Sequence, residues 1–339
     1  MKDITIIGRG LAGATLSFEL ISRGIPHRII DNPTLSSSSK VAAGLVNPIV
    51  LKRLKMVHDA DVFMKLIPDY YENLEHLCTS SFYTEATLHH VFASIGEINL
   101  WEEKKDLAFH SNYLNAVSKD SPAYIIAPFG LGHMHGIGWL NTTEYLSAHK
   151  RYCSQSDIVI EERSINQQEV QQLVNSETTV ILCNGHLLKE WDYLPKDTFS
   201  PTRGEVMTVY SEGLPKSSIL HGSIFSIPLG ENTFKVGATY HWDNFQDITT
   251  TDGLSKLKTD LEKIYSGPYT VVDHQAGVRP NTNDRKPIIG RLAKNLLVFN
   301  GMGSRAALMT PYLASLFADF LVNDTAIPPT YNVERFMSK

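Results

Sequence analysis

Residues 3–31 constrain the fold more than any other part of the chain. Residues 3–7 (DITII) are rich in β-branched side chains, which is typical of a short buried strand. The glycine-rich turn GRGLAG follows at residues 8–13, and a helical pattern of apolar side chains then runs to Gly24. Residues 27–31 (HRIID) have the pattern of a second strand, and this strand ends in an acid. The order of strand, glycine turn, helix and strand predicts a parallel α/β unit.

The spacing of the glycines in this unit indicates a dinucleotide site. Gly8 permits a tight turn, Gly10 lets the backbone approach a pyrophosphate, and Gly13 lets the helix pack closely on the strand. The helix N-terminus offers unpaired N–H groups to phosphates. Asp31 can accept hydrogen bonds from both hydroxyls of an adenosine ribose and would repel a 2′-phosphate, which disfavours NADP. The unit alone does not distinguish FAD from NAD.

Composition narrows the class of protein. The chain has 339 residues, which at about 150 residues per domain predicts about two domains. Its net charge of −5 disfavours a globally basic nucleic-acid-binding protein. Cys78, Cys153 and Cys183 form no CxxC pair, so we expect no metal site and a reducing compartment. No uncharged apolar run reaches about 18 residues, so we expect no membrane span and a cytoplasmic protein.

Two later segments carry further motifs. Residues 36–45 (SSSSKVAAGL) are small enough for their backbone to lie against a flat ring system, although such a run is also typical of a flexible serine-rich loop. The motif GVRPNTNDRKPIIG occupies residues 277–290, before a predicted strand at 295–300 and the turn GMGSR at 301–305. We expect a helix after this turn, from about residue 307 or 311 to residue 321.

The middle of the chain has the patterns of a second sheet. Residues 223–228 and 233–239 alternate as antiparallel strands do. Residues 254–265 predict an amphipathic helix with leucines on one face, which would pack on that sheet. Residues 178–185 (TTVILCNG) instead read as a later parallel strand of the first sheet.

Together these segments resemble the D-amino-acid-oxidase superfamily of FAD-dependent oxidoreductases, the glycine oxidase and sarcosine oxidase group. Residues 201–205 (PTRGE) and 236–239 (VGAT) are also similar to stretches of that family, in the right order. The resemblance implies an α/β fold, with a Rossmann-type FAD-binding domain and a second α+β substrate domain built on an antiparallel sheet, in the glutathione-reductase-like architecture. The implied domains are 1–80, 138–205 and 275–339 for FAD, and 81–137 and 206–274 for the substrate.

One branch of the family resembles the chain at the turn 301–305. That branch is the FAD domain of the bacterial bifunctional enzyme that matures wobble-uridine side chains in tRNA, where it oxidises a carboxymethylamino group. The chain departs from the pattern at Ala306, where a glycine usually ends the motif. A methyl group there could crowd the flavin edge or require a different φ.

The resemblance implies oxidation of the C–N bond of an amino acid or secondary amine. Members of the family transfer a hydride from the α-carbon to flavin, and the resulting imine hydrolyses; the cofactor carries the difficult chemistry. Arg279 is the implied carboxylate anchor, because a guanidinium can hold a carboxylate through two parallel N–H bonds. Arg305 is implied near the flavin or the substrate. Tyr240 and Phe225 are implied pocket walls, and Phe225 stands where glycine-oxidase-like members carry a tyrosine hydroxyl for the carboxylate.

The resemblance also assigns residues to non-covalent FAD. They cover the phosphate turn, the ribose, the flavin ring and, at Ile165, a backbone contact to adenine. The last helix would direct its N-terminus at the flavin edge that becomes negative on reduction. The implied cofactor-binding residues are Gly8, Gly10, Leu11, Ala12, Gly13, Asp31, Asn32, Ser38, Ser39, Ala43, Gly44, Leu45, Ile165, Gly301, Met302, Gly303, Ser304, Arg305, Ala306, Ala307 and Leu308.

Three alternatives remain open at this stage. The substrate could be tRNA, for which the basic cluster Lys52, Arg53 and Lys55 would contact phosphates, although the acidic net charge argues against it. Ala306 and Phe225 motivate a flavin-binding protein without amine turnover. An NAD dehydrogenase would leave the 277–290 motif unexplained. The amine, the electron acceptor and the oligomeric state are not readable from the sequence.

Overall fold

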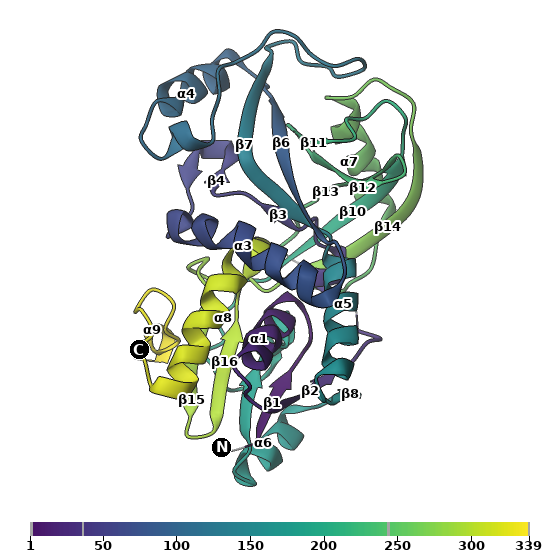
Figure 1. Cartoon of the computed structure of the whole chain (residues 1–339). Coiled ribbons are helices and arrows are strands. Elements are labelled where there is room, and N and C mark those ends of the chain that lie inside the picture. Colours follow the sequence, from purple (N-terminus) through teal and green to yellow (C-terminus); the bar gives the residue numbers. More distant parts are fainter. Residues whose placement is uncertain (1–2, 36, 243–244, 338–339) are drawn as a thin grey trace.

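The computed structural model describes residues 3–35, 37–242 and 245–337. Its strands form two large sheets, one in each half of the molecule (Figure 1). The lower half holds a six-stranded sheet with helices α1 (Leu11–Ser22) and α8 (Ala306–Asn323), and the upper half holds an eight-stranded sheet. Helix α3 (Ala60–Cys78) lies across the junction, in contact with α8 below and with the second sheet above.

The first sheet contains the predicted α/β unit. Its strands are parallel, except that the last two along the chain pair antiparallel. Strand β1 is buried along its whole length, with Ile4 and Ile6 in the core on one side of the sheet and Ile7 in the core on the other. The strand order is β15 (Ile288–Ala293), β16 (Leu296–Asn300), β9 (Thr179–Leu182), β1 (Ile4–Ile7), β2 (His27–Asp31) and β8 (Ile160–Glu162).

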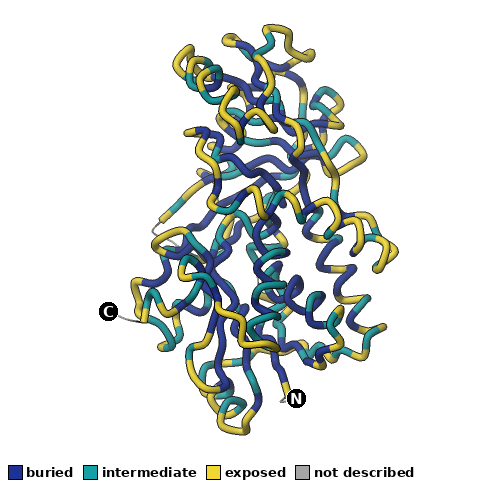
Figure 2. The backbone as a smooth tube through the Cα atoms, turned by 60° about the vertical axis from the view of Figure 1, so that its left-hand side comes forward, coloured by how far each residue is buried: buried dark blue, intermediate teal, exposed yellow. Residues whose placement is uncertain are grey.

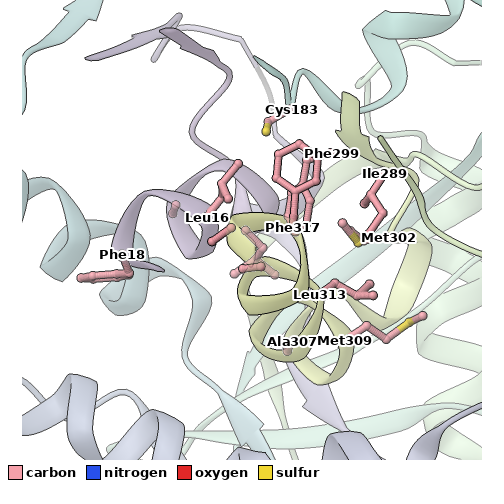
Figure 3. Close-up of a cluster of buried hydrophobic side chains, with 14 of the residues drawn as sticks. Leu16, Phe18, Cys183, Ile289, Phe299, Met302, Ala307, Met309, Leu313 and Phe317 are labelled. Carbon is pink, nitrogen blue, oxygen red and sulfur yellow. The ribbon is translucent and has the colours of Figure 1, made fainter. Parts of the chain in front are cut away.

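Helices α1 and α8 form the centre of the core on one side of this sheet. Figure 3 shows Leu16 of α1, Phe299 of β16 and Phe317 of α8 gathered there. Helix α5 (Thr142–Gln155) packs beside them, and α6 (Gln167–Asn175) lies on the opposite face of the sheet. The segment Gly303–Asn323 is long and apolar enough to cross a membrane, with a mean hydropathy of 1.3. Its packing against α1 and α3 is that of a core helix.

The second sheet is antiparallel except for one parallel pair, β6 with β11. The predicted strands at 223–228 and 233–239 are β12 and β13. The strand order is β14 (Thr270–Arg279), β10 (Thr202–Tyr210), β13 (Thr233–Gly237), β12 (Phe225–Gly230), β11 (Ser218–His221), β6 (Tyr83–Val91), β7 (Leu131–Leu140) and β3 (Leu45–Val46).

The predicted amphipathic helix is α7 (Thr251–Glu262), which packs on β10 and β13. It starts three residues before the expected 254 because Thr250 caps its N-terminus, where the Thr250 side chain accepts a hydrogen bond from the Gly253 N–H. The other described strands and α-helices are the two-stranded sheet β4 (Ile49–Val50) and β5 (Lys55–Met56), and the helices α2 (Ser38–Val41), α4 (Ile95–Lys105) and α9 (Glu334–Met337). Figure 2 shows buried segments in both halves and exposed segments mainly in peripheral loops.

The division into two discontinuous domains stays a proposal, and sheet membership supports it. The chain supplies the first sheet from residues 4–31, 160–182 and 288–300. Strands of the second sheet come mainly from residues 83–140 and 202–279. Strand β3, at 45–46, the last residues of β7 (138–140), the first residues of β10 (202–205) and the last residues of β14 (275–279) join the second sheet from ranges that we assign to the FAD domain. The chain therefore passes between the halves several times, and residues from both can line one site.

Candidate active site

A cavity of about 600 Å³ is lined by both halves of the molecule. From the first half it receives the turn between β1 and α1, the ends of β2 and β9, and the start of α8. From the second half it receives residues of β10, β12, β13 and β14. Residues 37–52, which connect the two sheets, line it as well. This volume is within the range of ligand sites, and the mixed lining joins a nucleotide-binding turn to a substrate sheet.

The glycine turn has the geometry that its spacing predicts. Gly10 is the N-cap of α1, so the helix N-terminus opens on the cavity. The Leu11 N–H donates to the Ser39 Oγ at 2.9 Å, which ties the turn to the serine segment. A Cβ on Gly13 would lie 1.9 Å from the backbone oxygen of Gly8, so only glycine allows this approach of helix and strand. These features fit a pyrophosphate at the N-terminus of α1.

Asp31 lies at the end of β2, beside the turn. Its Oδ1 accepts a hydrogen bond from the Arg9 backbone N–H at 2.8 Å, and its Oδ2 lies 3.9 Å from the Arg9 Nε. The Arg9 Nη1 donates to the Leu146 carbonyl at 2.7 Å. The Asp31 side chain stays 21% exposed, so it remains accessible as an acceptor for ribose hydroxyls.

The serine segment is structured, contrary to the flexible alternative, although Ser36 lies outside the described residues. Ser37 accepts a hydrogen bond from the Ser39 N–H and caps the short helix α2. Lys235 of β13 donates its Nζ to the Ala42 carbonyl at 3.1 Å. Gly44 has a φ of +69°, and a Cβ there would lie 1.9 Å from the Leu140 oxygen. The second sheet therefore holds this segment against the cavity.

Arg279, the implied carboxylate anchor, lies at the end of β14 and faces the cavity. Its guanidinium crosses the neighbouring strand at Gly204, where a Cβ would lie 2.4 Å from both Nη1 and Nη2. The Tyr240 ring packs on this group, with its centroid 4.5 Å from the Arg279 Cζ. The Nη1 atom is buried without a hydrogen-bond partner. Burial lowers the pKa of Arg279, so this site favours an anionic ligand.

The residues on either side of Gly204 have structural partners. Arg203 and Glu205 form a buried ion pair at 2.6 Å. The Thr250 hydroxyl donates to Glu205 at 2.8 Å, and the His274 Nε2 lies 2.8 Å from it. Within the segment 201–205, Gly204 therefore leaves room for the Arg279 guanidinium at the site. The charged residues on either side of it contact the start of α7 and strand β14 instead.

Arg305 is the N-cap of α8 and also lines the cavity. The pKa of Arg305 is lowered, mainly by burial and also by the nearby positive charge of Arg285, while Tyr240 acts in the opposite direction. Ala306, the departure from the family motif, has φ −53° and ψ −46° as the first residue of the helix. This is ordinary helical backbone, so the expectation that Ala306 requires a different φ is wrong.

The structure adds a histidine pair that sequence reasoning missed. His221 of β11 lies opposite Phe225 of β12, and both line the cavity. The His221 Nδ1 lies 3.0 Å from the Nδ1 of buried His90 on β6. Burial lowers the pKa of His221 to about 3 and that of His90 to about 4, so both rings are neutral at pH 7. No motif marks His221, because its position depends on the pairing of three strands.

Most of the implied site residues line this single cavity. Gly13, Gly301 and Leu308 do not: Gly13 serves helix packing, Gly301 has a φ of +77° in a tight turn, and Leu308 is buried in the core. Phe225 and Tyr240 line it as expected. The other implied residues in the lining are Gly8, Gly10, Leu11, Ala12, Asp31, Asn32, Ser38, Ser39, Ala43, Gly44, Leu45, Ile165, Met302, Gly303, Ser304, Ala306 and Ala307. Lining residues without a sequence signal include Asn47, Ile49, Leu51, Arg163, His186, Trp191 and His221.

The comparisons with known proteins agree with this geometry. The family model described as FAD dependent oxidoreductase, DAO, matches residues 3–320. The chain therefore belongs to the DAO family of FAD-dependent oxidoreductases, and FAD is the cofactor of that family.

Individual proteins are more distant. The bifunctional protein ThiO/ThiG of Trichormus variabilis (strain ATCC 29413 / PCC 7937) is 24% identical over 96% of this chain and 54% of its own length. The tRNA 5-methylaminomethyl-2-thiouridine biosynthesis bifunctional protein MnmC of Idiomarina loihiensis is 28% identical over 40% of this chain and 23% of its own. The chain thus spans about half or less of these relatives. The crystal structure of glycine oxidase from Bacillus cereus ATCC 14579 has a TM-score of 0.80 and 19% identity, covering 96% of both chains.

The residues present fit FAD without a covalent link. The helix N-terminus, Gly10 and Asp31 meet the needs of pyrophosphate and ribose, as described above. Cys183 is the cysteine in the cavity lining, and burial raises the pKa of its thiol well above the usual range. A neutral, buried thiol is a poor nucleophile.

Proposed function

We propose that this chain oxidises the C–N bond of a small amine that carries a carboxylate beside the reacting carbon. The observation that carries the proposal is the Arg279 guanidinium, which lies over Gly204 in the same cavity as the phosphate turn and has a buried Nη1 without a partner. A group of this kind suits a bidentate carboxylate. The similarity of the fold to that of a glycine oxidase supports an amino-acid-like substrate.

The chain's residues have separate tasks in this reaction. Arg279 holds the carboxylate, and thereby the α-carbon, in one orientation, which makes the transfer effectively intramolecular. Phe225 offers only an apolar wall, so the carboxylate depends on the guanidinium. The positive charges of Arg279 and Arg305 disfavour an ammonium ion and keep the amine neutral. FAD, when bound at the phosphate turn, would supply the acceptor for a hydride from the α-carbon. The N–H proton leaves to solvent, and water hydrolyses the imine to a carbonyl compound and either ammonia, from a primary amine, or an amine, from a secondary one.

The test is the visible spectrum of the purified protein without oxygen, as glycine, sarcosine and D-amino acids are added in turn. We expect one addition to bleach the oxidised flavin bands. Arg279→Met is expected to lower kcat/KM by about 100-fold, the effect of losing a charge-assisted pair in the transition state. Arg291 is exposed, so Arg291→Met is the control and should leave kcat/KM unchanged. Flavin that binds but stays oxidised with every amine, tRNA included, would favour the non-catalytic alternative.

A tRNA substrate is the second candidate, and an exposed basic cluster favours it. Lys52 lines the cavity, and Arg53 and Lys55 are exposed beside it on the β4–β5 segment. The MnmC relative agrees with this idea, over part of the chain. If tRNA binds there, the logarithm of its binding constant falls linearly with the logarithm of the salt concentration. Replacing Lys52, Arg53 and Lys55 by alanine should reduce the magnitude of that slope by about 2–3. No binding of tRNA at low salt would exclude this candidate.

A further inference from the structure

Two arginines at the cavity wall have no counter-charge among the residues that the structure describes. Arg279 and Arg305 both line the cavity, and neither guanidinium takes part in a hydrogen bond or ion pair with the part of the chain that the structure describes. Other partly or fully buried arginines are paired: Arg203 binds Glu205, and Arg23 binds Glu19 at 2.7 Å. A buried cation without a partner is costly, so an unpaired arginine in a cavity indicates an anionic ligand.

Both arginines belong to the same end of the cavity. Tyr240 packs on Arg279, and the same tyrosine acts electrostatically on Arg305. The exposed Arg285 also acts on Arg305, and its Cζ lies 5.3 Å from the Trp242 ring centroid. The Trp242 ring lies 5.7 Å from that of Tyr240. Positive charge therefore gathers around Tyr240 in the cavity wall and around Trp242, which lies beside it outside the lining.

The expected ligands account for only one of the two arginines. Asp31 is the sole carboxylate among the described lining residues, and it lies at the ribose end, beside the phosphate turn. The pyrophosphate charges of FAD would lie at the same turn, at the N-terminus of α1. A substrate carboxylate beside the reacting carbon would pair with the Arg279 guanidinium. The flavin edge at the start of α8 becomes negative only on reduction. While the flavin is oxidised, Arg305 therefore remains without an anion among the expected ligands and the described residues.

We propose that Arg305 binds a second carboxylate of the substrate, so that this site prefers amino dicarboxylates to amines with one acid group. The inference rests on the proposed function, because it takes the first carboxylate to lie on Arg279. The second carboxylate can be carried by the nitrogen, as in iminodiacetate, or by the α-carbon side chain, as in aspartate. Both forms of substrate place an amine between two carboxylates, and each carboxylate is bound by one guanidinium group.

A binding experiment tests the inference without turnover. Oxydiacetate and ethoxyacetate share the same five-atom C–C–O–C–C backbone. Oxydiacetate carries a carboxylate at both ends and ethoxyacetate at one end only. Neither has an amine to oxidise. The FAD-loaded protein is titrated with each, and the change in flavin absorbance gives the Kd. We expect oxydiacetate to bind about 10- to 100-fold more tightly, the effect of one charge-assisted pair. Equal Kd values would overturn the inference.

Matched variants assign the preference to one residue. Arg305→Met should remove the preference for oxydiacetate while leaving the Kd of ethoxyacetate within about twofold, and Arg305→Lys should retain part of it. Arg279→Met should weaken both acids. Arg291→Met is the control. If Arg305→Met weakens both acids equally and shifts the flavin midpoint potential, Arg305 serves the flavin, and the inference is wrong.

Turnover then separates the two forms of substrate and the two proposals. Higher kcat/KM for iminodiacetate than for N-ethylglycine supports a carboxylate on the nitrogen, and a preference for aspartate over 2-aminobutyrate supports one on the α-carbon. Bleaching by monocarboxylates that is as efficient as bleaching by dicarboxylates overturns this inference and leaves the proposed function standing. If no amine bleaches the flavin while the oxydiacetate preference persists, the proposed function fails and the second-anion site stands.

Discussion

At the scale of single residues, the site depends on Gly204, whose lack of a side chain leaves room for the Arg279 guanidinium. The guanidinium lies across β10 in this space, and the Tyr240 ring packs on that guanidinium. The sequence marks both residues through separate motifs, 201–205 and 277–290, but nothing in either motif states that they touch. The contact arises because β10 and β14 pair with Gly204 opposite Gly277.

We predict that Gly204→Ala damages the carboxylate grip but spares the fold. The new Cβ would lie 2.4 Å from the far end of the Arg279 side chain, which can move away, so stability should change by less than about 1 kcal/mol. The displaced guanidinium should raise the KM for the amine by about 10-fold or more. Thermal unfolding and anaerobic flavin reduction check the two parts. A KM equal to that of the wild type would contradict this role for Gly204.

At the scale of elements, the β1–α1–β2 unit is the part of the site that a local pattern can specify. Its glycines, its helix and Asp31 follow one another within residues 4–31, and the structure forms them as predicted. The serine segment 37–45 differs, because the lysine of β13 and the end of β7 hold it in place from the second sheet. An isolated serine-rich stretch has no such partners, which is why its sequence alone also allowed a flexible loop.

The closeness of α1 to β1 leads to a second prediction. Gly13→Ala would place a Cβ 1.9 Å from the Gly8 carbonyl oxygen, which is backbone and cannot move without shifting the turn. We expect a loss of stability of about 1–3 kcal/mol or more, together with weaker FAD binding. Urea unfolding and FAD titration measure the two effects. Gly96→Ala in exposed α4 is the matched control, because its Cβ would meet only the Ser94 Oγ at 3.6 Å.

At the scale of the whole molecule, two sheets enclose one cavity, and both contribute to its chemistry. The first half supplies the nucleotide turn and Arg305, and the second supplies Arg279, Tyr240 and Phe225. The parallel pair β6–β11 adds His221 to the cavity wall and buried His90 behind it. Because these rings are buried or half-buried and neutral, they make the stability of the whole fold depend on pH.

We predict that stability falls as the pH is lowered below about 6.5. Burial lowers the pKa of His90 to about 4, and Glu97, with Oε2 3.8 Å from its Nε2, opposes this in part. The unfolded chain therefore binds a proton at a higher pH than the folded one. The His90 contribution is complete above about pH 6.5 and is lost from there towards pH 4. At pH 5 the loss is on the order of 2 kcal/mol for this ring.

Urea unfolding at pH 7 and pH 5 measures this loss. His90→Gln removes the titrating ring, so its stability should fall by about 2 kcal/mol less between these pH values than that of the wild type. Exposed His58 offers the control His58→Gln, which should keep the wild-type difference. If His90→Gln and the wild type lose the same stability, His90 is not the source.

The sequence by itself determined the features that depend on neighbours along the chain. The strand–glycine turn–helix–strand unit, the acid at its end, the alternating strands β12 and β13 and the apolar last helix all follow from local spacing and steric limits. Only the tertiary structure decided which side chains meet across strands and halves. The approach of Arg279 to Gly204 and Tyr240 and the His90–His221 pair depend on strand order and register. The packing of α8 brings Arg305, which has no ion-pair partner among the described residues, to the same end of the cavity. Strand order and register are set by burial over the whole molecule, because a shift of one residue in register would turn the strand side chains Arg279, His90 and His221 to the opposite face.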